Sequence, residues 1–210
     1  MSIPGNNIDP IMARYGPYYF ALGRFVQNFA DAEGMILSIL WQFAETTPEV
    51  SQSIFSGTHG KGAIDFIKRI CEAKHLPPDA ELETSFAQFQ VLNDARNTIL
   101  HHGALIDGDG LVSTNEWMAN KLPRTIKRFP VSAAILDDMA FDAETIRFRL
   151  IMFSMIGKMI LLPEPIQPLR ERADQPWRYK PPQQASPPRK TPDKGEAHPR
   201  QQQSSPEKPL

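Results

Sequence analysis

The sequence predicts a mainly α protein: an antiparallel helical bundle with a small β-hairpin inserted before the last long helix. Three observations lead to this fold class. Apolar residues recur every three or four positions over most of the chain up to Leu162, which is the spacing of a buried helical face. Short breaks separate these stretches, and short connections favour antiparallel neighbours. An Asp-Gly pair between two short apolar runs follows Gly103, and this is a strong hairpin signal.

The expected helices follow from this periodicity and from residues that begin or end helices. Thr46, Thr47 and Pro48 separate the first helix from a short second one, since proline suits a first helical turn. Asp79 is the expected N-cap of the fourth helix, and Ser132 is that of the last. The helices are expected at residues 17–45, 48–57, 63–76, 80–102 and 132–162.

The character of the sequence changes after Gly103. ALI-DGDG-LVSTNEW predicts two short strands joined by a tight turn near residues 104–116, because Asp-Gly favours the turn types that hairpins need. RTIKRFPVS, residues 124–132, is compatible with a third extended piece. The insertion therefore separates the fourth helix from the last one.

The chain divides into three regions. Residues 1–17 are expected to form an N-terminal arm, and residues 18–162 a single helical domain. Residues 163–210 are rich in Pro, Gln, Ser and Lys and lack apolar periodicity. Such a segment cannot bury enough apolar surface to offset its ordering entropy, so we expect a disordered tail. Trp177 and Tyr179 are the exceptions, because they could dock locally.

Composition excludes several classes of function. The formal net charge is -1, so no strong positive field marks the chain as a nucleic-acid binder. Cys71 is the only cysteine, which excludes an intramolecular disulfide and a cysteine-based zinc site within one chain. The N-terminus lacks the pattern of a signal peptide, and the most apolar run is too short and too charged to span a bilayer. We expect a cytoplasmic protein that uses no metal or cofactor.

The fourth helix carries polar residues where its apolar stripe should continue. Arg96 takes one of these positions. A neighbouring apolar row can hold the core instead: Leu92, Ala95 and Ile99. Asn97 and His101 lie one turn apart, and the side chain of Arg96 is long enough to bend toward them. The sequence therefore predicts a polar strip of Arg96, Asn97 and His101 on the C-terminal half of this helix.

A purely structural interpretation of the end of this helix competes with a functional one. Histidines near a helix C-terminus interact favourably with the helix dipole, and Gly103 can take the left-handed conformation that ends a helix. His101, His102 and Gly103 thus form a good stop signal with no function attached. On spacing alone, this interpretation is favoured.

The stretch ARNTILHHG resembles the signature of the HEPN superfamily, Arg-Asn-x-x-x-His late in a long helix of an α bundle. Arg96, Asn97 and His101 match it. The resemblance covers about residues 18–162, with LGRFVQNFADAEGMI in the first helix, a short strand insertion and VSAAILDDMAFDAETI in the closing helix. Many members of this superfamily are metal-independent ribonucleases, often toxins or phage-defence effectors. Others have lost catalysis and serve as binding or dimerisation modules.

This resemblance implies a metal-independent endoribonuclease that acts as a homodimer. RNA cleavage without a metal needs a base for the ribose 2′-hydroxyl, an acid for the leaving 5′-oxygen and positive charge for the phosphorane. His101 is suited to carrying protons, and Arg96 is suited to binding phosphate oxygens. Asn97 is suited to orienting one of these two side chains. One histidine cannot easily be both acid and base, and the family solves this with two motifs that face one cleft in a symmetric dimer. The implied partners are RNA, a second copy of the chain and an antitoxin or other regulator protein.

Other residues limit or extend this interpretation. Gly103 stands where the toxins paired with a nucleotidyltransferase antitoxin have a tyrosine, which excludes control by tyrosine modification at that position. Glu33 is a candidate partner for Arg96, and a solvated helix edge is an equal alternative. His102 is a weaker candidate that is more typical of capping or packing. Two further functions stay open: a catalytically inactive HEPN-like interaction or RNA-binding module, and a helical adaptor outside the family.

Overall fold

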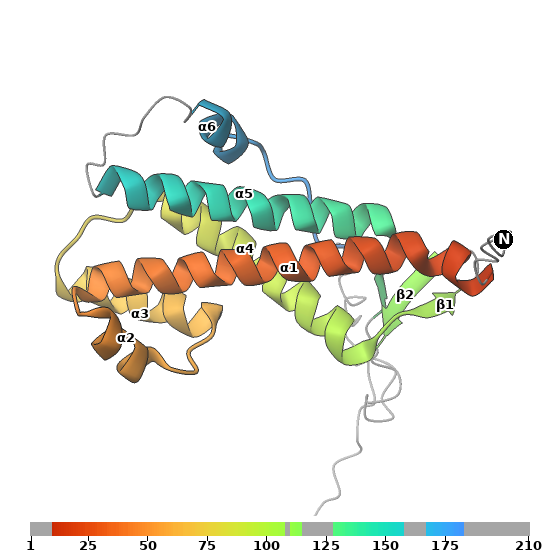
Figure 1. The fold of residues 1–210 in the computed structure, drawn as a ribbon, viewed down its shortest axis with the longest axis horizontal. Helices are drawn as coiled ribbons and strands as arrows, with labels where there is room; N and C mark the ends of the chain where they lie inside the picture. Colours follow the sequence, from red (N-terminus) through yellow and green to blue (C-terminus); the bar gives the residue numbers. More distant parts are fainter. Residues whose placement is uncertain (1–9, 108–109, 115–127, 158–166, 183–210) are drawn as a thin grey trace, which may run out of the picture.

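Six helices and three short strands make up the residues that the computed structural model describes, 10–107, 110–114, 128–157 and 167–182. The elements along the chain are α1 (Pro10–Ala44), α2 (Pro48–Phe55), α3 (Gly60–Ala73), α4 (Ala80–His102), β1 (Leu105–Asp107), β2 (Gly110–Thr114), β3 (Arg128–Pro130), α5 (Ala133–Gly157) and α6 (Gln167–Ala173) (Figure 1). The predicted fold class, mainly α with a small hairpin before the last long helix, is confirmed.

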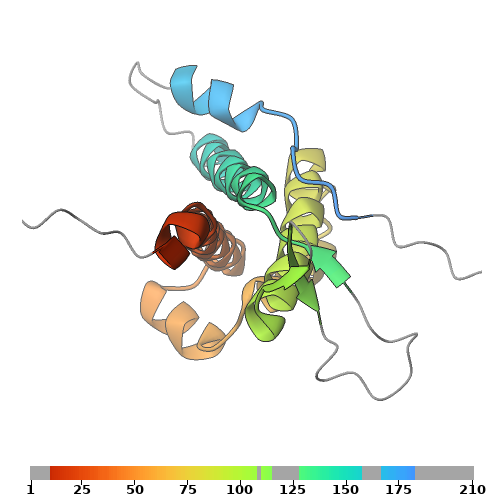
Figure 2. The ribbon, with the colours of Figure 1, turned by 90° about the vertical axis from the view of Figure 1, so that its right-hand side faces the viewer.

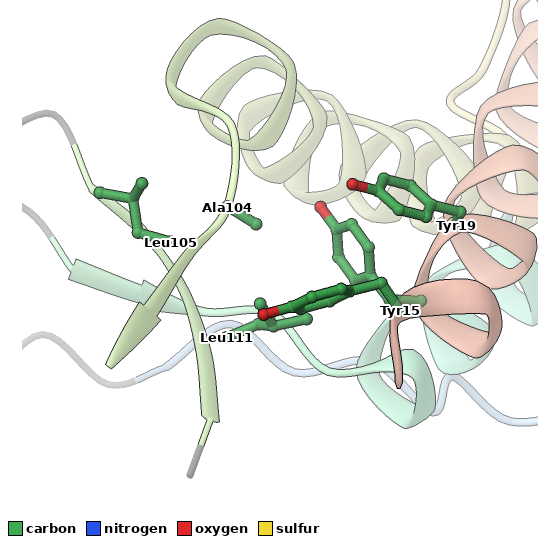
Figure 3. A pocket seen from close by; sticks show the side chains of 6 residues that line it. Tyr15, Tyr19, Ala104, Leu105 and Leu111 are labelled. Carbon is green, nitrogen blue, oxygen red and sulfur yellow. The ribbon is translucent and has the colours of Figure 1, made fainter. Parts of the chain in front are cut away.

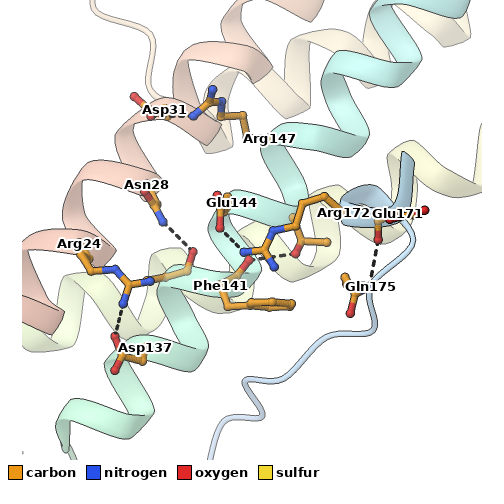
Figure 4. Close-up of polar contacts among 12 residues, drawn as sticks. Arg24, Asn28, Asp31, Asp137, Phe141, Glu144, Arg147, Glu171, Arg172 and Gln175 are labelled. Atoms are coloured by element: carbon orange, nitrogen blue, oxygen red, sulfur yellow. Dashed lines mark hydrogen bonds and ion pairs between the residues drawn. The ribbon is translucent and has the colours of Figure 1, made fainter. Parts of the chain in front are cut away.

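Consecutive long helices run antiparallel, so α1 and α5 lie side by side in the same direction with α4 running back along them (Figure 1). The order of the contacts shows this direction. Arg24 pairs with Asp137 at 2.9 Å near the start of both helices, and Gln42 Nε2 donates to Ser154 Oγ at 2.8 Å near their ends. Between these, the Asn28 amide donates to a backbone carbonyl of α5 at 3.0 Å (Figure 4). Polar bonds thus fix the register of the longest helix pair.

The apolar core lies among α1, α3, α4 and α5. Aromatic rings meet where α1 crosses α4: Phe29 stacks on Phe89 with ring centroids 4.7 Å apart, and Phe25 packs edge-on against Phe29 at 6.0 Å. Such pairs add to the stabilisation that burial of their surface already gives. The largest fully buried side chains are Phe25, Phe89, Ile36, Ile39, Leu40, Ile67, Leu92, Ile99, Leu136, Met139, Ile146 and Leu150.

The predicted helix caps form. Asp79 Oδ1 accepts a hydrogen bond from the Leu82 N–H at 2.9 Å at the start of α4, and Ser132 Oγ accepts one from the Ile135 N–H at 3.2 Å at the start of α5. Each cap stabilises its helix by about 1 kcal/mol, because it satisfies an N–H group that has no partner within the helix. Thr47 caps α2 in the same way. From the sequence, Thr47 is expected only as part of the break between the first two helices.

The insertion after α4 is a three-stranded antiparallel sheet in the order β1-β2-β3. Leu105 pairs with Val112 in the hairpin, and Val112 pairs with Pro130 of β3. Both the hairpin and the third extended piece of the sequence analysis are therefore present. Buried Ser113 fastens the sheet to α4, because its hydroxyl donates to the backbone carbonyl of Thr98 at 3.1 Å.

α1 begins earlier than the sequence analysis expected. Residues 1–17 were assigned to an arm, but the helix starts at Pro10 and runs through Pro17. A proline inside a helix removes one hydrogen bond and costs about 3 kcal/mol. Tyr15 and Tyr18, on either side of this proline, face the sheet across a pocket. The contacts of these two tyrosines with the sheet favour a helix through Pro17, although the local sequence disfavours a helix there.

Residues 167–182 belong to the folded body, which corrects the predicted start of a disordered tail at residue 163. α6 lies on the outer side of α5, and an extended segment continues from it toward α4 (Figure 2). We call this segment, residues 174–182, the strap. Tyr179 is 5% exposed and joins the core, and Trp177 packs against that core. The expectation that these two residues dock is confirmed.

A buried carboxylate on α5 holds one end of the strap. Asp142 is fully buried, and it accepts the backbone N–H groups of Arg178 at 2.8 Å and Tyr179 at 2.9 Å. The Gln88 amide of α4 donates to the same carboxylate at 2.8 Å. Burial raises the pKa of Asp142 above its ordinary value, against the opposing effect of these three donors.

An arginine on α5 holds the other end. The Arg149 guanidinium donates to the backbone carbonyls of Ala173 at 2.7 Å and Gln175 at 3.0 Å. It also lies over the Trp177 ring, 4.2 Å from the centroid. The helices thus supply partners for the strap backbone, which composition alone does not reveal.

Some predictions fall on residues that the structure does not describe. These are the hairpin turn at 108–109, the expected end of the last helix at 158–162 and the tail at 183–210. Among the helices of the described residues, none is both long and apolar enough to cross a bilayer.

Candidate active site

α4 ends where the sequence predicts it, and Gly103 then turns the chain into β1. The φ angle of Gly103 is 67°, a value that favours glycine because it has no Cβ. Its N–H donates to the Ile99 carbonyl at 2.9 Å and closes the helix. The predicted end of the helix, with Gly103 at a positive φ, is therefore confirmed. This stop uses the backbone, and it assigns no task to the side chains of His101 and His102.

The apolar row that was expected to replace the interrupted stripe does form the core face of α4. Its members are all nearly or fully buried: Leu92, Ala95 and Ile99. Leu100, which continues the apolar spacing of the first half of the helix through Arg96, is 43% exposed. In the C-terminal half of α4, Arg96, Asn97 and His101 therefore lie beside the core face and not within it.

The arginine of the polar strip is held in place from two sides. Arg96 is half-buried, and its guanidinium donates to Asn97 Oδ1 at 3.2 Å. Its Cζ atom lies 5.5 Å from the centroid of the Phe29 ring on α1. A guanidinium supported in this way loses less conformational freedom when it binds an anion. Asn97 therefore orients Arg96, one of the two roles that the sequence analysis gave it.

The charge of Arg96 is not neutralised by the described part of the molecule. No carboxylate among the described residues pairs with Arg96, although other arginines of the bundle such as Arg24 and Arg147 have such partners. An arginine without a carboxylate keeps its donors available for phosphate oxygens. In this respect Arg96 differs from Arg24 and Arg147, which form ion pairs between α1 and α5.

The two histidines differ in exposure. His101 is exposed and His102 is half-buried, and neither side chain hydrogen-bonds to any described residue. His101 shares the face of Asn97 one turn away, because residues four apart are neighbours on a helix. A solvent-accessible imidazole in this place can exchange protons with a bound molecule. His102 has no such neighbour within the strip.

Glu33 does not act as a partner of Arg96, which corrects one of the alternatives left by the sequence. Its Oε1 atom accepts the backbone N–H of Gly60 at 2.7 Å and thereby caps α3. Gly60 is buried against the Phe89 ring, and a Cβ at this position would lie 2.5 Å from that ring. Sequence alone could not show that the N-terminus of α3 passes so close to α1. The other alternative for Glu33, a solvated helix edge, does not describe it either.

A pocket beyond the C-terminal end of α4 was not expected from the sequence. It lies between the N-terminal part of α1 and the sheet, and it has a volume of about 440 Å³. Three tyrosines of α1 face it, Tyr15, Tyr18 and Tyr19 (Figure 3). The cluster of tyrosines in YGPYYF was a usable signal, but its stretch had been assigned to the arm and the helix start.

Among the described residues, no group of three or more His, Cys, Asp or Glu is placed to hold a metal ion. Comparison of the chain with family models, curated protein sequences and solved structures gives no match.

Proposed function

We propose that the protein is a metal-independent endoribonuclease of the HEPN type that acts as a homodimer. The observation that carries this proposal is the state of Arg96. Its guanidinium is held by Asn97 and Phe29, and it has no carboxylate partner among the described residues. Asn97 in turn shares a helix face with the exposed His101, one turn away. A fixed cation and a proton carrier on one helix are the groups that cleavage of a phosphodiester without a metal requires.

The reaction is a transesterification within the RNA. A histidine accepts the proton of the ribose 2′-hydroxyl, and the 2′-oxygen attacks the neighbouring phosphorus. The bond from phosphorus to the 5′-oxygen then breaks, and this oxygen takes a proton from an acid. Arg96 stabilises the charge on the equatorial oxygens of the phosphorane. The products are a 2′,3′-cyclic phosphate and a free 5′-hydroxyl.

A second copy of the chain completes this chemistry. One His101 supplies only one of the two proton-transfer groups, and the exposed position of His101 leaves it accessible to a symmetry-related copy. In a two-fold dimer the same surface of both subunits meets, so two polar strips would face one cleft. The pair of Arg96 side chains would also supply local positive charge to a body whose net charge is slightly negative.

The experiment that tests the proposal is a nuclease assay of the purified full-length protein in EDTA. We expect single-stranded RNA to be cut to products with 2′,3′-cyclic phosphate ends, and His101→Ala to abolish the cutting. His59→Ala is the matched control, because His59 is also exposed at a helix end and its side chain makes no cap hydrogen bond. Equal cutting by the wild type and His101→Ala would refute the proposal.

One observation favours the alternative of a catalytically inactive interaction or RNA-binding module. Arg96 packs on the aromatic core through Phe29, so its presence has a structural explanation that needs no catalysis. An inactive module would bind RNA through Arg96 and show no cleavage in the assay above. A role in a toxin or phage-defence system, with an antitoxin or regulator as partner, belongs to the enzyme proposal and is tested by expression in cells.

A further inference from the structure

The pocket between α1 and the sheet is lined by side chains that suit the binding of a flat, uncharged ring. Six residues line it: Tyr15, Tyr18 and Tyr19 from α1, and Ala104, Leu105 and Leu111 from the sheet (Figure 3). None of these six carries a charge at neutral pH. The volume of about 440 Å³ falls within the usual range of small-molecule sites. The lining therefore offers aromatic faces, aliphatic walls and phenolic hydroxyls.

The three tyrosine rings are arranged around this space at an angle to one another. Tyr18 and Tyr19 meet edge-on with centroids 5.4 Å apart, and the Tyr15 and Tyr19 rings are 6.5 Å apart at 57°. Figure 3 shows Tyr15 and Tyr19 extending from α1 toward the side where Ala104 and Leu111 lie. Tyr19 is 55% exposed, so much of its surface is accessible to a ligand.

Tyr18 differs from Tyr19 because it is nearly buried. Burial and the neighbouring Tyr19 raise the pKa of Tyr18, so its phenol stays protonated at neutral pH and can donate a hydrogen bond. A ring held in the core with a protonated hydroxyl is a fixed polar group at the edge of an aromatic site. Nucleobases present acceptors on their edges that such a group can recognise.

The pocket is physically joined to the helix that carries the polar strip. Ala104 follows α4 after Gly103 alone. It lies three positions after His101, so their Cα atoms are at most roughly 11 Å apart. The bond from Ser113 to the Thr98 carbonyl ties the sheet to the same helix turn as the strip. The pocket and the strip therefore keep a fixed spacing, as a substrate that contacts both would need.

We propose that this pocket binds a base of single-stranded RNA, stacked on Tyr19, one or a few nucleotides from the phosphate that the polar strip holds. The proposal rests on the proposed function and adds the recognition of the substrate to it. Stacking on an aromatic ring tolerates every base because each has a π-face. It also requires an unpaired base, which restricts the substrate to single strands.

The test is RNA binding, measured without cleavage. The probe is a fluorescein-labelled single-stranded RNA of eight nucleotides with 2′-O-methyl groups throughout, which removes the attacking hydroxyl. We expect Tyr19→Ala to weaken its binding about tenfold or more, and Tyr19→Phe to retain it, because phenylalanine still stacks. Phe20→Ala is the matched control, since Phe20 is 70% exposed next to Tyr19 and does not line the pocket.

A second arm locates the bound base. Replacing single nucleotides by abasic ones, position by position, should reveal one position where the loss weakens binding to the wild type and has little effect on Tyr19→Ala. Equal binding by the wild type, Tyr19→Ala and Phe20→Ala overturns the base pocket, as does a wild type that binds no probe. The nuclease assay on unmodified RNA is separate, so cleavage that persists in Tyr19→Ala with unchanged KM would leave the enzyme proposal standing without this pocket. If RNA binding depends on Tyr19 but no RNA is cleaved, the base pocket would stand and the enzyme proposal would fail.

Discussion

Arg96 lies over the ring of Phe29, with its Cζ atom 5.5 Å from the ring centroid. The same ring stacks on Phe89 of α4, with the two ring centroids 4.7 Å apart. A charged residue of the polar strip is thus attached to the aromatic contact between α1 and α4. The proposed catalysis and the packing of α1 on α4 would both depend on this side chain, and substitution separates the two contributions.

Arg96→Ala should lower RNA cleavage much more than it lowers stability. Loss of a group that stabilises charge in the transition state costs about 100-fold or more in turnover, whereas loss of a cation–π contact at a half-buried site costs about 1 kcal/mol. Single-turnover cleavage and urea unfolding measure the two effects. Arg69→Ala is the control, because Arg69 lies over Phe66 in a similar way, 5.8 Å from the centroid, on another helix. A large stability loss with unchanged cleavage per folded molecule would make Arg96 purely structural.

The main features of α4 could be read from its sequence because they are local. Its N-cap at Asp79 and its end at His102 both follow from residues within a few positions of each helix end. The role of Glu33 could not be predicted in this way, since Gly60, which it binds, lies on a different helix. Nothing in the order of residues indicates which carboxylate will meet which N–H across a bundle.

The order of the strap could not be predicted from its own sequence either. A proline-rich segment with few apolar residues reads as disordered, because composition counts what a segment can bury by itself. Its order depends on Asp142 and Arg149, which stand on α5 and supply hydrogen bonds to its backbone. The sequence indicated only the two aromatic exceptions, Trp177 and Tyr179.

Gly60→Ala should destabilise the protein by about 1–3 kcal/mol, the usual cost of overpacking a core. The added Cβ would lie 2.5 Å from the Phe89 ring and 3.3 Å from Glu33 Oε1, so both the core and the α3 cap must shift. Gly34→Ala is the matched control, because no atom lies within 4 Å of a Cβ there. Alanine is the better helix former, and this control should gain up to about 1 kcal/mol. Urea unfolding of the two variants should move in opposite directions.

Tyr179→Ala and Tyr179→Phe should separate the apolar and polar contributions of the strap. The ring is 5% exposed, so its removal should cost about 3–5 kcal/mol, as for other buried aromatic residues. Its buried hydroxyl has no hydrogen-bond partner among the described residues. Loss of such a group can be neutral or stabilising, and we expect Tyr179→Phe to unfold at the same or a higher urea concentration.

Two shortened chains test the strap as a whole. A chain that ends at Pro182 keeps the strap, and one that ends at Asp174 loses it and leaves Asp142 without two of its three donors. A buried acceptor that loses its partners costs about 1–3 kcal/mol. The shorter chain should therefore be clearly less stable than the longer one. Equal stability would show that the strap contributes nothing to the fold.

The stability contributed by Asp142 should depend on pH in a definite direction. Burial raises the pKa of Asp142, so the folded state binds this proton more tightly than the unfolded state. Its contribution to the free energy of unfolding is then largest below the ordinary pKa of about 3.9 and falls as the pH rises through the folded pKa. The difference in the free energy of unfolding between the wild type and Asp142→Ala should therefore shrink as the pH rises above the ordinary pKa of about 3.9. If this difference instead grew as the pH rose, the three hydrogen-bond donors would have a larger effect on the pKa of Asp142 than its burial has.

Mixing subunits tests whether two copies of His101 share one active site. If each dimer needs both histidines, a dimer with one His101→Ala subunit lacks either the acid or the base, and proton transfer lost in this way costs about 100-fold or more. Activity should then fall with the square of the wild-type fraction when wild type and His101→Ala are unfolded and refolded together at constant total concentration. His59→Ala in place of His101→Ala should leave activity unchanged, which controls for losses in refolding. A linear fall would show that each chain carries a complete site, and the composite dimer would be wrong even with His101 as a catalytic residue.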